Sequence, residues 1–97
     1  MKRKILTPGE LSTALKSLDG WISTGKVVKK RLTFPNFAEA LDFVNRVGTL
    51  AEAADHHPDI TLGWGYAEIA LTTHDRGGIT DVDMALAATI DLILSSS

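Results

Sequence analysis

All three histidines of this 97-residue chain stand at the predicted ends of regular elements, where functional side chains are commonly found. His56 and His57 follow a long helical pattern. Pro58 disfavours helical geometry at His57, so the helix should end there and the two imidazoles should diverge. His74 lies where the last predicted strand leaves its sheet. Because imidazole suits proton transfer near neutral pH, we predict that the three histidines share acid and base roles in one pocket.

Two carboxylates are placed to assist these histidines. Glu52 precedes His56 by one helical turn, so it is either placed to orient that imidazole or is a solvated helix residue, and spacing alone favours the second. Asp83 stands three residues after Thr80, which is the spacing of a capping box, and it is expected to cap a helix, to support the site, or to do both. Trp64 either offers a flat platform for a planar ring or is itself a core side chain. The alternative to catalysis is a His-His-Pro sequence that only ends a helix favourably.

Other catalytic chemistries lack the residues that they need. The chain contains no cysteine, which removes disulfides, thiolate metal sites and cysteine nucleophiles. Adjacent His56 and His57 cannot share one helical face, and no His-Glu-x-x-His pair is present, so no metal site is predicted. No serine stands in a Gly-x-Ser-x-Gly elbow, and Gly77-Gly78 is expected to form a turn instead of a phosphate-binding loop.

Length, composition and charge favour one globular domain that spans residues 1–97. Hydrophobic residues make up 44% of the chain and charged residues 23%, an ordinary balance for a packed domain. The net charge is -2, and the basic stretches at 2–4 and 29–31 are expected to be solvated surface, so we predict no direct nucleic-acid binding. No apolar run reaches the length of a membrane span, and the basic N-terminus lacks the apolar segment of a signal peptide. These features predict a cytoplasmic protein.

Three helix starts share one signature, in which an N-cap residue precedes an acidic residue by three positions. The first helix should run to about Leu18 and stop at Asp19-Gly20. Behind the second and third starts, apolar residues recur at the spacing of one helical face. The three pairs are Thr7 with Glu10, Asn36 with Glu39, and Thr80 with Asp83.

Alternating apolar residues predict strands between these helices, with Gly25-Lys26 as a hairpin turn. The stretches are 21–24, 27–34, 60–64 and 67–71. Lys30 interrupts the apolar face of the second strand. The element order is therefore αββαββα. It predicts an α+β fold in which a four-stranded antiparallel sheet carries three helices on one face and is open, or covered by a partner, on the other.

Three segments carry a more specific pattern. They are 52–59 (Glu-Ala-Ala-Asp-His-His-Pro-Asp), 72–75 (Thr-Thr-His-Asp) and 77–83 (Gly-Gly-Ile-Thr-Asp-Val-Asp). Together they resemble the signature of the pterin-4a-carbinolamine dehydratases, and the similarity continues in order from Leu11 to Leu86-Ala87. The resemblance implies the αββαββα subunit, and it implies sheets that associate into a homodimer or homotetramer.

The resemblance also implies a reaction on a small-molecule pterin. A tetrahydropterin with a hydroxyl at C4a loses water to give the quinonoid dihydropterin, which requires an acid for the departing hydroxyl and a base for the N5 proton. No cofactor and no metal is implied. His57 and His74 are expected to lie nearest the reaction. The expected site residues are the catalytic His56, His57 and His74, the supporting Glu52 and Asp83, and the substrate-binding Pro58, Thr73 and Trp64.

The last predicted turn departs from the family pattern. Where the family commonly has a Tyr-Asn pair, this chain has Trp64-Gly65, and Gly63 stands where a large residue often precedes it. We expect a reshaped hairpin there. The main alternative to the enzyme is a non-catalytic binding module on the same fold, which acts as a dimerisation partner of transcription factors or as an assembly factor. Another is a homologue that acts on a different reduced pterin or heterocycle. Retention of the histidines favours the dehydratase.

Overall fold

A computed structural model describes residues 4–95 of the chain, so Lys2, Arg3 and the last two serines lie outside the described residues. Its helices are α1 (Pro8–Lys16), α2 (Phe37–Ala54), the 3-10 helix η1 (His74–Arg76) and α3 (Asp81–Ser95). Its strands are β1 (Ile22–Ser23), β2 (Val28–Thr33), β3 (Asp59–Gly63) and β4 (Tyr66–Leu71).

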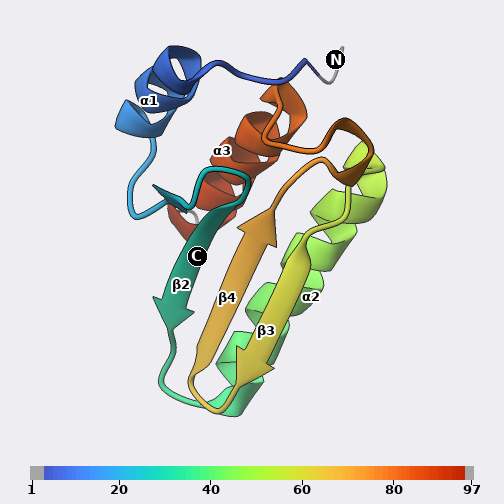
Figure 1. Cartoon of the computed structure of the whole chain (residues 1–97). Coiled ribbons are helices and arrows are strands. Elements are labelled where there is room, and N and C mark those ends of the chain that lie inside the picture. Colours follow the sequence, from blue (N-terminus) through green and yellow to red (C-terminus); the bar gives the residue numbers. More distant parts are fainter. Residues whose placement is uncertain (1–3, 96–97) are drawn as a thin grey trace.

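The four strands form one antiparallel sheet in the order β1-β2-β4-β3, which confirms the predicted α+β fold. Helices α2 and α3 lie behind the sheet and α1 lies beyond its end (Figure 1). Strand β4 is central, and its alternate residues Ala67, Ile69 and Leu71 are fully buried beneath the helices. Within residues 4–95, no helix is long and apolar enough to cross a membrane.

The predicted caps begin the helices, although only one forms the full reciprocal box. Thr7 Oγ1 accepts from the Glu10 backbone N–H at 3.1 Å, and Glu10 Oε1 accepts from the Thr7 N–H at 2.9 Å. Asn36 accepts from the Glu39 N–H at 2.9 Å, but the Glu39 side chain meets the Asn36 amide group instead of its backbone. Helix α1 ends at Lys16, two residues before the predicted end, because the chain already turns at its C-cap.

Lys30 lies on the helix-covered face of β2, as the broken alternation indicates, and its charge is paired there. Its Nζ donates to the Asp19 carbonyl at 2.6 Å and to Asp91 Oδ1 at 3.1 Å. The Trp21 indole N–H donates to the same Asp91 oxygen at 2.9 Å. These bonds join β2 to α3, so the lysine tolerates a largely apolar surrounding.

The open face of the sheet carries a charged and aromatic cluster. Glu68 on β4 pairs with Lys29 at 3.7 Å and with Arg31 at 3.8 Å on β2. The Arg31 guanidinium lies 4.1 Å from the centre of the Tyr66 ring. That ring covers Gly63, where a Cβ atom would lie 2.2 Å from Tyr66 Cε1. Glycine at this departure from the family pattern therefore makes room for the tyrosine.

Candidate active site

The end of α2 sends the two adjacent histidines in different directions. Asp55 adopts a left-handed conformation (φ 50°, ψ 43°) and ends the helix, with its N–H bonded to the Glu52 carbonyl at 3.2 Å. The chain then turns so that His56 packs inward with 6% of its surface exposed. The side chain of His57 remains 57% exposed. The predicted divergence of the two imidazoles is confirmed.

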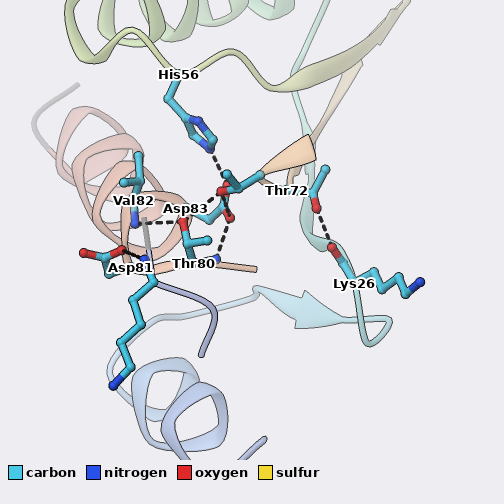
Figure 2. A network of polar contacts seen from close by, with 9 residues as sticks. Lys26, His56, Thr72, Thr80, Asp81, Val82 and Asp83 are labelled. Atoms are coloured by element: carbon cyan, nitrogen blue, oxygen red, sulfur yellow. Dashed lines mark hydrogen bonds and ion pairs between the residues drawn. The ribbon is translucent and has the colours of Figure 1, made fainter. Parts of the chain in front are cut away.

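His56 is held by a buried carboxylate on α3. Its Nε2 lies 2.5 Å from Asp83 Oδ1, and the Asp83 side chain is fully buried. The other Asp83 oxygen accepts from Thr73 Oγ1 and from the Thr80 backbone N–H, each at 2.8 Å. Figure 2 shows His56 pointing from the end of α2 toward this cluster at the start of α3. Asp83 thus caps the helix, as predicted, and also contacts His56, while its supporting role in a functional site stays a prediction.

The predicted contact between Glu52 and His56 is wrong. Glu52 Oε2 instead contacts His57 Nε2, and both of these side chains are exposed. The cause is the left-handed turn at Asp55, which carries His56 under the helix toward α3 and leaves His57 beside the last helical turn. His56 and His57 therefore contact different carboxylates: that of His56 is buried, and that of His57 is exposed to solvent.

His74 enters the site from the other side, as the first residue of η1 after β4. The turn predicted at Gly77-Gly78 is present. Gly77 has φ 74° and its N–H bonds to the Thr73 carbonyl at 3.0 Å. Between this turn and the end of α2 lies a surface cavity of about 260 Å³. Its lining residues are Asp55, His56, His57, Thr72, His74 and Asp75.

The structure thus brings all three histidines to one cavity. Three larger grooves lie elsewhere, of about 570 Å³ beside α1, about 570 Å³ between α2 and α3, and about 370 Å³ over β1, β2 and β4. Apolar side chains dominate the first two, and none of the three is lined by a histidine. Within residues 4–95, no three His, Cys, Asp or Glu residues converge in an arrangement that would hold a metal ion. Proton transfer is the chemistry that the histidine cavity supports best.

The residues expected to bind the substrate do not line the histidine cavity. Thr73 is fully buried, and its hydroxyl faces Asp83 instead of the cavity. It shares a side of the chain with Leu71, whereas Thr72 points the other way and lines the cavity. Trp64 is 74% exposed in the β3–β4 turn, at the far end of these strands from the histidines (Figure 1). Pro58 is half-buried beside the cavity-lining His57.

Sequence reasoning missed several residues that build the site. Thr80 enters the cluster through its side chain as well as its backbone, because its Oγ1 lies 2.8 Å from Thr73 Oγ1. Its place as an N-cap was the available signal. Asp55, Thr72 and Asp75 line the cavity, and each stands directly beside a predicted histidine or within two residues of it.

The chain is similar to proteins of one family. The model of the family described as pterin 4 alpha carbinolamine dehydratase matches residues 4–93. A relative from Mycobacteroides abscessus is 44% identical over 87 residues, which cover 90% of this chain and 93% of the relative. One from Sulfurisphaera tokodaii is 41% identical over 92 residues, covering 95% and 99%. Both are named, provisionally, as pterin-4-alpha-carbinolamine dehydratases.

Solved structures show the same likeness. A crystal structure described as a transcriptional coactivator/pterin dehydratase from Brucella melitensis has a TM-score of 0.86 and 29% identity, covering 93% of this chain and 98% of its own. A pterin dehydratase-like protein, described as a RuBisCO assembly factor in the alpha-carboxysome, has a TM-score of 0.66 and 30% identity, covering 80% and 93%. From the family match and these relatives together, the chain belongs to the pterin 4 alpha carbinolamine dehydratase family.

Proposed function

We propose that this protein dehydrates a 4a-hydroxytetrahydropterin to the quinonoid dihydropterin by histidine acid–base catalysis. The observation that carries the proposal is the meeting of His56, His57 and His74 at one cavity, with His56 backed by buried Asp83. Membership of the dehydratase family supports the choice of substrate class.

The reaction needs two proton transfers and no external electron donor. The C4a–O bond breaks, and the departing oxygen takes a proton from an acid and leaves as water. A base removes the proton from N5, whose electron pair forms the N5=C4a double bond. A pair of imidazoles in opposite protonation states supplies both groups near neutral pH. The exposed His57 and His74 have the solvent access that allows protons to be exchanged after each turnover.

Self-association and location complete the proposal. We expect a homodimer or homotetramer, because a chain of this size buries a modest fraction of its surface when it is alone. We expect this assembly in the cytoplasm. Exposed Ile22 on edge strand β1 supports further association. Size-exclusion chromatography with light scattering measures the assembly directly, and a monomer at micromolar concentration contradicts this part of the proposal.

A binding role is the second candidate, because the structural relatives include proteins described as a coactivator and as an assembly factor. Such a protein does not require a buried Asp83 aligned on His56. That geometry favours the enzyme over a module that only binds.

The test is the rate of 4a-hydroxytetrahydropterin dehydration, with substrate generated by phenylalanine hydroxylase and a metal chelator present throughout. We expect the purified protein to accelerate dehydration in proportion to its concentration. A folded sample that leaves the spontaneous rate unchanged contradicts the proposal and favours the binding role.

A further inference from the structure

The cluster behind the cavity supplies Asp83 with three hydrogen-bond donors. They are His56 Nε2 on Oδ1 at 2.5 Å, and Thr73 Oγ1 and the Thr80 N–H on Oδ2, both at 2.8 Å. The Asp83 side chain is fully buried, so water does not compete for these positions. Because an ionised carboxylate only accepts hydrogen bonds, three donors around the buried Asp83 side chain favour its ionised form.

The hydroxyl protons in this cluster have a fixed direction. Thr73 has a single hydroxyl proton and donates it to Asp83 Oδ2. The 2.8 Å contact between the Thr73 and Thr80 hydroxyls must therefore be donated by Thr80. Thr80 Oγ1 in turn accepts from the Val82 N–H at 3.3 Å, at the start of α3 (Figure 2). The result is a one-way chain of donors from Thr80 through Thr73 to Asp83.

This series of hydrogen bonds determines which nitrogen of His56 is available for chemistry. Because Asp83 accepts, His56 Nε2 carries the proton of their shared hydrogen bond. No residue among 4–95 bonds to Nδ1 of this imidazole, and no buried side-chain nitrogen or oxygen of these residues lacks a partner. Nδ1 is therefore not fully buried, and His56 is one of the residues that line the cavity.

We propose that Thr73 is a positioning residue, which with Thr80 fixes Asp83 so that His56 presents Nδ1 to the cavity as the base for the N5 proton. The assignment rests on the proposed dehydratase function and names the base within it. In this step the N5–H bond breaks and a Nδ1–H bond forms. The N5 electron pair makes the N5=C4a bond as the C4a–O bond breaks, and the oxygen takes its proton from the imidazolium of His57 or His74.

Several titratable groups face His56 and contribute to its pH dependence. One is buried at the start of α3, and the rest line the cavity from the end of α2 and from η1. They are Asp83, Asp55, His57, His74 and Asp75. Changes at Thr73 leave all of these groups in place, so a shift in the pH profile reports on the hydrogen-bond chain itself.

The first test compares Thr73→Val, Thr73→Ser and Thr89→Val by kcat, KM and pH profile. Thr73→Val should lower kcat roughly tenfold or more with little change in KM, because it removes a hydrogen bond to a buried charge. It should also move the acidic limb of the kcat/KM profile to higher pH, since Asp83 with one donor fewer is a stronger acceptor for the His56 imidazolium. Thr73→Ser should restore both. Thr89→Val, whose hydroxyl bonds only within α3, should match wild type.

The second test is independent of activity. Long-range 1H–15N spectra of the full chain distinguish protonated from unprotonated imidazole nitrogens, with the His56 signals identified by a His56→Gln variant. We expect His56 to carry its proton on Nε2 in wild type, and we expect its imidazolium signals to persist to higher pH in Thr73→Val than in wild type. A proton on Nδ1 in wild type, or a folded Thr73→Val with unchanged kcat and pH profile, overturns the proposal. If wild type shows no dehydratase activity, the proposed function fails, while the spectra still decide the positioning claim.

Discussion

At the scale of single residues, two neighbouring histidines have opposite environments. His56 meets a fully buried carboxylate, whereas His57 meets Glu52 in solvent. An exposed ion pair contributes little, because water screens it and two flexible side chains must be ordered. A buried carboxylate with three donors fixes its partner much more firmly. We therefore expect Asp83 to matter more for catalysis than Glu52.

Substitution of each carboxylate by its amide tests this difference. Asp83→Asn should lower kcat roughly 10²–10⁴-fold, since it disturbs the alignment of a general base. Glu52→Gln should change kcat less than about tenfold, as expected for an exposed pair. Steady-state dehydration kinetics on folded samples measure both. Equal losses for the two variants would contradict the division of roles.

The sequence singled out the three histidines that meet at one cavity, but it did not identify the partner of each. Residue type and position at element ends indicated the histidines, whereas the choice of Glu52 and Asp83 depended on the family resemblance. The partner of His56 depends on the left-handed conformation of Asp55, which a non-glycine residue adopts only occasionally. Helical spacing alone therefore placed Glu52 beside His56, and the turn reversed it.

At the scale of elements, caps and turns set the boundaries that position the site. The element order and the hairpin at Gly25-Lys26 followed from N-cap spacing and strand alternation, which are local properties of the chain. The ion pair of Lys30 with Asp91 could not be predicted in this way, because Asp91 lies 61 residues away and only tertiary packing brings it near. The close approach of Tyr66 to Gly63 is another consequence of register that composition does not reveal.

Two glycines should respond to alanine with opposite signs. Gly63→Ala places a Cβ against the Tyr66 ring, so we expect it to destabilise the fold by about 1–3 kcal/mol and to displace the ring from Arg31. Gly48→Ala lies in α2 with open space around the new atom, and should stabilise by about 1 kcal/mol. Urea unfolding measures both free energies, and stabilisation by Gly63→Ala would refute the packing argument.

The cap of α1 predicts an acid-sensitive contribution to stability. The Thr7 backbone N–H that bonds to Glu10, with the nearby Lys4 charge, holds the pKa of Glu10 below its usual range. A lowered folded-state pKa gives stabilisation that is present above the ordinary glutamate pKa and is lost as the pH falls through the lowered value. Wild type should therefore lose more stability on acidification than Glu10→Gln does. If the urea midpoints of wild type and Glu10→Gln fall equally as the pH is lowered through this range, the contribution of the Glu10 cap to stability is ruled out.

At the scale of the whole molecule, the site is assembled where distant segments meet at one end of the sheet. Strands β3 and β4 form an antiparallel pair with Asp59 opposite Ala70, so the start of β3 and the end of β4 must adjoin. Packing of α3 against α2 then brings Asp83 beneath His56. The meeting of the two strand ends followed from the predicted hairpin, whereas the contact between Asp83 and His56 did not.

The same topology explains why Trp64 does not join the histidines of its own chain. The five residues of β3 advance the chain by roughly 15 Å, so the β3–β4 turn lies at the opposite end of the sheet. The N-terminal segment instead approaches the site from behind, where the Leu6 N–H bonds to the Ile79 carbonyl at 3.0 Å and the Lys4 N–H to Asp81 at 3.0 Å. These bonds hold the loop that leads into α3.

The most direct test of the account is the dehydration rate of single alanine variants at His56, His57 and His74, with exposed Asn45→Ala as the control. If the three imidazoles share the proton transfers, at least His56→Ala and one other variant should lose roughly 10²–10⁴-fold in kcat while they keep the wild-type fold by circular dichroism. The control should retain full activity. Full activity in all three folded histidine variants would contradict the claim that this cavity is the active site.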